Sequence, residues 1–208
     1  WRRRGVNVII SASYKTDIPT FYGKWFMNRL EAGFCHMVNP YNGQAYKVDL
    51  SLKSADAFVF WTKNIGPFMD SLQKVHDHGY PFMVQHTING YSRSLETSVV
   101  NYERSINNMK EICNKFGPEI AVWRYDPVVF TSETPEEFHK TNFAHFASAL
   151  KGYTNEVVIS FAQTYRKTKN NMDRAATANN LTWFDPPDDL KRDLAVSFRE
   201  ISESNGMQ

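Results

Sequence analysis

Residues 120–127 read Ile-Ala-Val-Trp-Arg-Tyr-Asp-Pro, an apolar run that turns polar at its end. Its first part, Ile120–Arg124, is nearly continuous in apolar, β-branched and aromatic residues. Such a run is typical of a strand that is buried on both faces of a parallel sheet. Four other short runs share this character: Val6–Ile10, Ala57–Trp61, Phe82–Gln85 and Val157–Phe161. The sequence therefore predicts five buried strands.

Helical patterns separate these runs, with apolar residues recurring every three or four positions. The stretch Phe34–Lys53, which holds Asn-Pro and Asn-Gly turns, is expected to be an irregular insertion or a hairpin. A strand followed by a helix, repeated along the chain, predicts an α/β fold with right-handed crossovers. The expected helices cover residues 19–32, 66–78, 98–116, 135–150 and 188–203.

An open doubly wound sheet and a (β/α) barrel share this pattern. No Gly-x-Gly-x-x-Gly follows the first strand, which disfavours a dinucleotide-binding domain. A complete eight-unit barrel needs about 250 residues, whereas this sequence has 208. We therefore expect a single domain over residues 1–208, a partial TIM-like (β/α) barrel of parallel strands with five β/α units. The short tail after Gly206 favours a fragment of a longer chain that stops before a sixth strand.

Composition excludes several classes of protein. No run of eighteen apolar residues exists, which excludes a membrane-spanning helix. The 24 Lys and Arg against 22 Asp and Glu give a net charge of only +2, so charge alone indicates no strong phosphate-binding surface. The two cysteines, Cys35 and Cys113, are too few for a disulfide scaffold or a four-thiolate metal site. With no secretory signal in the sequence, a cytoplasmic protein is expected.

Polar side chains gather where the expected strands end. Because ligands of α/β proteins bind beyond the carboxyl ends of parallel strands, we expect these side chains to form one ligand site. The alternative is a structural network in which Arg124 pairs with Asp126 or Asp17. The candidate catalytic residues are Asp17, Lys63, Arg124 and Asp126. The candidate cofactor-binding residues are Ser11, Ser13, Thr16, Asn64, Gln85, Ser160, Gln163 and Arg166.

Other side chains give weaker signals. The spacing of the six histidines suits no shared metal ion, although His86 at a strand end is placed for chemistry or for a structural role. The basic segment Tyr165–Asn170 either binds phosphate or begins a solvated helix. Most Phe residues follow helical stripes and are expected in the core. Six aromatic residues near the strand ends are expected to stack on a planar ligand, although the two Trp among them could instead fill the barrel: Tyr14, Trp61, Tyr91, Trp123, Tyr125 and Tyr165.

Motifs spread over nearly the whole chain carry a resemblance to a known family. Ile9–Pro19 with Phe21-Tyr22 is similar to a family opening ISASRRTDIPAFY, and Trp25–Gly33 is similar to its WFMNRLxAG helix. Four further stretches are similar to the motifs NPFN, VFWTKNP, WRYDP and SFxxxYRK: Val38–Asn42, Val59–Asn64, Trp123–Pro127 and Ile159–Lys167. The family is domain of unknown function 1848, found in microbes. Tyr14 and Ile65 depart from it, replacing its usual Arg and Pro.

The resemblance implies a barrel-like fold related to radical S-adenosylmethionine enzymes. It also implies a C-terminal Cys-x-x-x-Cys-x-x-Cys motif that holds a 4Fe-4S cluster, and this sequence lacks that motif. No cofactor is expected to bind this chain alone, whereas a 4Fe-4S cluster and S-adenosylmethionine are expected if the full-length chain carries the motif.

Three hypotheses about function follow. The first is a radical S-adenosylmethionine-like enzyme with a small-molecule or nucleotide ligand at the strand ends, where Arg124 and Lys63 would bind a carboxylate or phosphate. The second is a cluster-independent hydrolase or lyase that uses Asp17 or Asp126 as a base. The third is a non-catalytic module that binds nucleotide or nucleic acid in a larger complex. The sequence indicates neither the substrate nor the oligomeric state.

Overall fold

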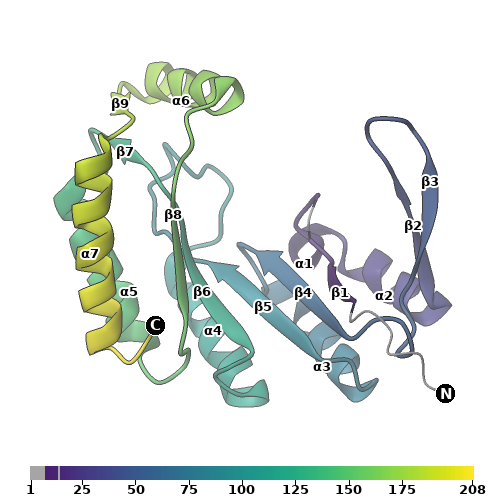
Figure 1. Ribbon diagram of the computed structural model, residues 1–208. Helices are drawn as coiled ribbons and strands as arrows, with labels where there is room; N and C mark the ends of the chain where they lie inside the picture. Colours follow the sequence, from purple (N-terminus) through teal and green to yellow (C-terminus); the bar gives the residue numbers. More distant parts are fainter. Residues whose placement is uncertain (1–7, 14) are drawn as a thin grey trace. The chain divides into compact units, whose positions relative to one another are not determined.

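The computed structural model describes residues 8–13 and 15–208 of a mixed α/β chain (Figure 1). Its central element is a five-stranded parallel sheet in the order β1-β4-β5-β6-β8. The five predicted strands are confirmed: β1 (Ile9–Ser11), β4 (Ala57–Thr62), β5 (Phe82–Thr87), β6 (Ala121–Val128) and β8 (Val157–Phe161). The first two positions predicted for the first strand lie outside the described residues.

The order of the sheet ends at β1 and β8, so the described strands form an open sheet. Barrel geometry therefore stays a prediction. The chain divides into two compact units, Trp1–Gln85 and His86–Gln208, and each is described by itself below. A single domain over the whole chain stays a prediction as well. Among the described residues, no helix is both long and apolar enough to cross a membrane.

In the first unit, helices cover one face of β4. Phe58 and Phe60 alternate with more exposed neighbours along this strand, and both rings pack edge-on against Phe26, with centroids 5.4 and 5.2 Å away. Phe68 completes this aromatic core. The helical elements of the unit are α1 (Ile18–Phe21), α2 (Gly23–Ala32), the short 3₁₀ helix η1 (Gly66–Phe68) and α3 (Met69–Asp77).

The helix predicted over residues 19–32 is divided at Tyr22. Asp17 caps the first part, α1, and the second part, α2, begins at Gly23. A Cβ atom added to Gly23 would lie 2.9 Å from the Phe68 ring, so this close approach of α2 to η1 requires a glycine. α2 ends at Ala32, and the Gly33 that follows has a φ of 76°, the left-handed conformation of a glycine C-cap.

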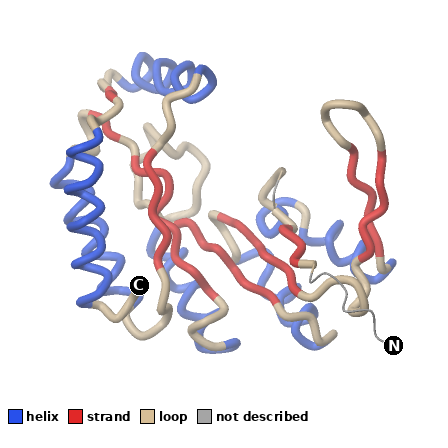
Figure 2. The backbone as a smooth tube through the Cα atoms, viewed as in Figure 1, coloured by secondary structure: helices blue, strands red, loops and turns tan. Residues whose placement is uncertain are grey.

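The stretch Phe34–Lys53 is largely a hairpin, which confirms one of its two predicted forms (Figure 2). Strands β2 (Phe34–Val38) and β3 (Ala45–Asp49) pair antiparallel, with Cys35 opposite Val48. Asn39 begins the connecting turn. Its side-chain oxygen accepts a hydrogen bond from the amide of Tyr41, and its backbone carbonyl accepts one from the amide of Gly43.

The second unit packs helices against β6. Trp123 stacks on Phe143 with ring centroids 4.7 Å apart, and Phe143 stacks on Phe198 at 4.3 Å. Tyr125 contacts both Phe143 and Phe198 edge-on. The elements here are α4 (Tyr102–Phe116), β7 (Phe130–Thr131), α5 (Glu136–Leu150), α6 (Arg166–Asn179), β9 (Trp183–Phe184) and α7 (Asp188–Ser204).

This packing corrects the prediction that Trp123 and Tyr125 are available to stack on a ligand. Both side chains have no exposed surface and lie against α5 and α7. Successive residues of a strand point to opposite faces, so side chains that neighbour Arg124 and Asp126 in sequence point away from them. Trp61 and Tyr165 are exposed, as a stacking role requires, and Tyr14 lies outside the described residues.

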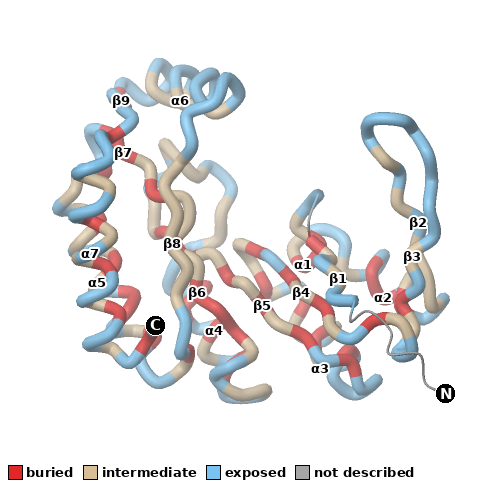
Figure 3. Tube along the Cα trace, viewed as in Figure 1, coloured by how far each residue is buried: buried red, intermediate tan, exposed pale blue. Residues whose placement is uncertain are grey.

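The short strands β7 and β9 are absent from the sequence-based prediction, which gives helix α6 only as one of two interpretations of the segment Tyr165–Asn170. α6 holds no buried residue (Figure 3), so it has no apolar stripe from which a helix could be predicted. β7 and β9 pair antiparallel over only two positions, which is too short for a periodic pattern. The basic segment Tyr165–Asn170 begins α6, in agreement with its reading as a solvated helix start.

Candidate functional site

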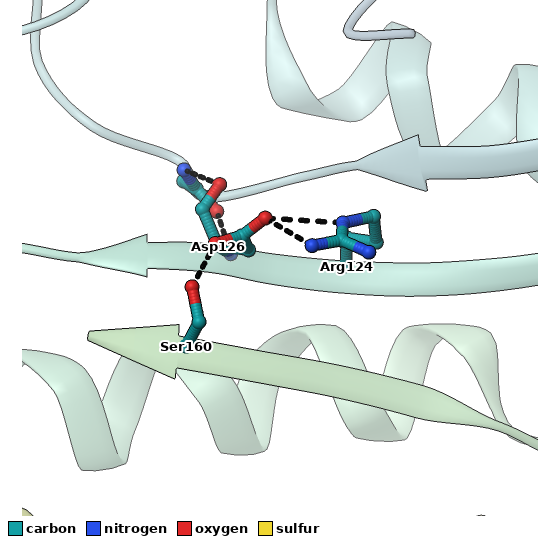
Figure 4. A network of polar contacts seen from close by, with 4 residues as sticks. Arg124, Asp126 and Ser160 are labelled. Carbon is teal, nitrogen blue, oxygen red and sulfur yellow. Dashed lines mark hydrogen bonds and ion pairs between the residues drawn. The ribbon is translucent and has the colours of Figure 1, made fainter. Parts of the chain in front are cut away.

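Arg124 and Asp126 lie two residues apart on β6, so their side chains share one face of the strand. One carboxylate oxygen of Asp126, Oδ2, accepts hydrogen bonds from Nε of Arg124 at 3.1 Å and from its Nη2. The other, Oδ1, accepts from the Ser160 hydroxyl on β8 (Figure 4). The predicted pairing of Arg124 with Asp126 is therefore confirmed, and a serine from the next strand joins it.

Asn89 ties the end of β5 to this group. Its Nδ2 donates to the Asp126 carbonyl at 3.0 Å, and its Oδ1 accepts from the Asp126 amide at 2.9 Å. The side chain of Asn89 therefore forms hydrogen bonds with both the backbone amide and the backbone carbonyl of Asp126, and Asn89 is only 2% exposed. We call Asn89, Arg124, Asp126 and Ser160 the strand-end network.

The strand-end network is partly buried but reachable from solvent. The side chains of Arg124 and Asp126 are 14% and 22% exposed. Partial burial strengthens the attraction between the two charges, and it makes loss of either partner costly. A guanidinium in such a position can bind a carboxylate or phosphate in a fixed geometry, while the carboxylate can accept hydrogen bonds from ligand hydroxyls.

A second set of hydrogen bonds, partly or fully buried, supports the network from α5. Asn142 of α5 donates to the Asn89 carbonyl at 2.6 Å and to the Tyr125 hydroxyl at 3.1 Å. The Tyr125 hydroxyl also lies 3.0 Å from Nδ1 of His139, and Nε2 of His139 lies 3.0 Å from the Val129 carbonyl. A carbonyl only accepts, so Nε2 carries the proton and Nδ1 accepts from Tyr125.

The groups in this chain of hydrogen bonds, including His139 and Tyr125, are uncharged in the folded protein. Burial lowers the pKa of His139 to about 4, against a smaller opposing effect of its hydrogen bond to the Val129 carbonyl. Burial also raises the pKa of Tyr125 far above its usual range. The imidazole and the phenol therefore both stay uncharged at neutral pH and hold α5 against β6.

A cavity of about 190 Å³ adjoins Asn89. The residues after β5 form one wall, where Arg93 donates to the carbonyls of Thr97 and Val99 at 3.1 and 2.7 Å. The start of α4 forms the other wall, including Tyr102 and Ser105. Asn89 is thus the member of the strand-end network that lines this cavity, whose lining does not include Arg124, Asp126 or Ser160.

Two candidate catalytic residues, Asp17 and Lys63, lie in the first unit. Asp17 is the N-cap of α1, since its Oδ1 accepts from the Thr20 amide at 2.9 Å. Its Oδ2 accepts from the Thr62 hydroxyl and from the Lys63 amide, both at 3.0 Å. These contacts are those of a residue that binds the start of a helix to the end of β4.

The candidate cofactor-binding residues are distributed over both units. Ser11 ends β1 and Thr16 is exposed in the loop that follows, whereas the buried Ser13 hydroxyl has no hydrogen-bond partner in the described part of the chain. Asn64 accepts from the amide of Gly66 at 3.2 Å. Three others are Gln85, half-buried on β5, and Gln163 and Arg166, both exposed near the start of α6. Of this set, Ser160 joins the strand-end network as described above.

Residues that could hold a metal do not gather in the described part of the chain, where no group of three His, Cys, Asp or Glu forms a site. His86 is fully buried on β5, which favours its structural role. Cys113 is also buried, and burial raises the pKa of its thiol to about 11. The 4Fe-4S cluster implied by the resemblance needs three thiolates, and this sequence has two cysteines. The residues present do not fit the cluster.

Sequence reasoning missed Asn89, Asn142 and His139 as parts of this site. A signal existed for Asn89, because the Asn89-Gly90 dipeptide that follows the third strand is a turn sequence. No comparable signal marks Asn142 or His139, because their partners are 10 to 53 residues away in the chain.

Comparison with known proteins gives one match. Residues 9–208 match the family described as Domain of unknown function (DUF1848). No curated protein and no solved structure matches the chain.

Proposed function

From the premise that this chain belongs to the DUF1848 family, we propose that it forms the ligand-binding part of an enzyme whose ligand binds at the carboxyl ends of the parallel strands. The observation that carries this proposal is the strand-end network. An ion pair from the middle and carboxyl-terminal part of β6 and a serine hydroxyl one residue before the end of β8 lie together, partly exposed, on the opposite face of β6 from the aromatic core. The carboxyl ends of strands are where α/β enzymes bind their ligands.

The chemistry of the network favours a ligand with both an anionic group and hydroxyl groups. Arg124 would bind the anionic group, because guanidinium matches the planar geometry of carboxylate and the oxygens of phosphate. Asp126 and Ser160 would both accept from hydroxyls of the same ligand, because Ser160 donates its one hydroxyl hydrogen to Asp126. Asn89 holds the Asp126 backbone and so keeps the carboxylate in place without ligand contact of its own.

The finer form of the proposal is a radical S-adenosylmethionine-like enzyme. Its support is the motif resemblance and the match in chemistry, because S-adenosylmethionine carries one carboxylate and two ribose hydroxyls. When bound with its cluster, this cofactor supplies radical chemistry. The residues of this chain would bind and orient the cofactor, with Arg124 on the carboxylate and Asp126 on a hydroxyl. No step is assigned to the cluster, whose thiolate ligands this sequence does not supply.

The test is calorimetric titration of the purified protein with S-adenosylmethionine. We expect saturable binding that Arg124→Ala weakens at least about tenfold, equivalent to about 1.4 kcal/mol. Arg199→Ala is the matched control, because Arg199 is an exposed arginine of the same unit that pairs only loosely with Glu203 at 3.9 Å.

Melting temperatures separate a binding effect from a folding effect. Arg124→Lys keeps the positive charge and loses the bidentate geometry of the guanidinium. We therefore expect this variant to fold and to bind S-adenosylmethionine with an affinity between those of the unmodified protein and Arg124→Ala. Absence of binding to the unmodified protein would contradict the S-adenosylmethionine-like form. Equal binding by the Arg124→Ala and Arg199→Ala variants would contradict the assignment of the network.

A further inference from the structure

A second cavity, also of about 190 Å³, lies wholly within the first unit. Its walls are the end of β1 with the following loop, helix α2, and one face of the β2–β3 hairpin. Buried apolar side chains form its floor, among them Ile18, Phe26 and Leu50. Cys35, Met37 and Val48 of the hairpin add a further apolar wall. This space has no part in the function proposed above.

Two cationic side chains line this apolar space. Arg29 of α2 is half-buried, and within the described part of the chain no hydrogen bond or ion pair joins it to another residue. Lys15 of the loop after β1 is exposed, and its Nζ donates to the Val38 carbonyl at 3.0 Å. A carbonyl does not neutralise an ammonium group, so both charges lack a carboxylate there.

This combination has a physical cost that a ligand would remove. A partly buried cation without an anionic partner loses hydration and gains no compensating attraction. The apolar walls of the cavity are also costly to hydrate. An anion with an apolar body would satisfy both features, because its charged group meets Arg29 and Lys15 while its body displaces water from the walls.

We propose that this cavity binds a small organic anion with a compact apolar body of about one ring, such as an aryl carboxylate or aryl phosphate. The size limit comes from the volume, because an apolar cavity of about 150 Å³ holds a single benzene ring. Trp25, at 46% exposure, and Phe26 supply aromatic surface for such a body. Arg29 binds the anionic group, and Lys15 adds a second cation at the mouth.

The primary test is calorimetric titration of the whole chain with benzoate, in parallel with phenyl phosphate, benzyl alcohol and acetate. We expect saturable binding of the two aryl anions. Binding of benzyl alcohol, which lacks the anionic group, and of acetate, which lacks the ring, is expected to be at least about tenfold weaker. The tighter of the two aryl anions identifies the anionic group. Acetate bound as tightly as benzoate, or no binding of either aryl anion, overturns the proposal.

Variants locate the binding. Arg29→Gln is expected to weaken benzoate binding at least about tenfold, whereas Lys24→Gln, which removes an exposed cation from the same helix, is expected to leave it unchanged. Val48→Phe is expected to fill the cavity and to abolish binding while the variant keeps its melting temperature. Benzoate binding that survives both Arg29→Gln and Val48→Phe overturns the assignment.

The reactivity of the Cys35 thiol gives a measure of binding that is independent of calorimetry. Cys35 lines the cavity and is half-buried, so benzoate is expected to slow its alkylation by N-ethylmaleimide, measured by peptide mass spectrometry. Alkylation of Cys113, which is buried on α4, serves as the internal reference for unfolding. Unchanged Cys35 alkylation at saturating benzoate contradicts binding in this cavity.

Discussion

Gly90 shows how a single residue positions the strand-end network. Its backbone has a φ of 65°, in the left-handed region, directly after Asn89. A Cβ atom at this position would lie 2.6 Å from the Phe146 ring and 3.0 Å from the Asn142 side chain. Both the conformation and the lack of space therefore require glycine here.

We expect Gly90→Ala to destabilise the protein by about 2–4 kcal/mol, because backbone strain and overpacking both contribute. Urea unfolding measures the change. Gly152→Ala is the matched control, because Gly152 has a φ of 79° with no atom near its Cβ position and so incurs the backbone cost alone. Equal losses for the two variants would show that contact with Phe146 and Asn142 is unimportant.

His139 makes stability depend on pH. Its pKa is lowered from 6.5 to about 4 in the folded protein, mainly by burial, so the unfolded chain binds a proton more readily between these values. The contribution of the neutral imidazole is fully present above pH 6.5 and is lost as pH falls towards 4. Over that window we expect a loss of roughly 3 kcal/mol from this residue.

His139→Gln tests this expectation, because glutamine can still donate to Val129 and accept from Tyr125 without titrating. The free energy of unfolding is measured in urea at pH 7 and pH 5 for both proteins. The variant is expected to be less stable at pH 7 and to show a flatter dependence on pH. An unchanged slope would mean that His139 is not the source of the pH dependence.

At the scale of elements, Asp17 joins helix α1 to the end of β4. Asp17→Ala removes the helix cap and the acceptor for Thr62 and Lys63, and we expect a loss of about 1–3 kcal/mol. Asp17→Asn keeps an oxygen for the cap at Thr20 and is expected to lose less. Thermal or urea unfolding gives both values. A catalytic Asp17 would behave differently, with activity lost and stability unchanged in the asparagine variant.

The elements differ in how well sequence predicts them. The five strands and most helices follow from apolar periodicity, because packing against a core imposes that period. Helix α6 lacks a buried face and so has no period to detect. The prediction that Trp123 and Tyr125 stack on a ligand is wrong, although the sequence also allows a filling role for Trp123. β6 continues to Val128, and its alternation directs both side chains to the helices. Strand alternation applied past Arg124 would have placed them correctly.

At the scale of the molecule, the sequence predicts the charged residues of the site better than their supports. Arg124, Asp126 and Ser160 stand out because polar side chains end apolar runs. Asn142 and His139 reach β6 from α5, and such contacts arise only when the chain folds. A common ligand site for all twelve candidate residues stays a prediction, since Asp17 and Lys63 belong to one compact unit and Arg124 and Asp126 to the other.

The most direct test of the central claim is an amide NMR titration of the isotope-labelled protein with S-adenosylmethionine. The largest shifts are expected for the amides of Asp126 and Ser160 and for the amides next to Asn89. Arg124→Ala is expected to abolish these shifts while the spectrum of the folded protein remains. Saturable binding that leaves the Asp126 and Ser160 resonances unmoved would contradict the strand-end network as the ligand site.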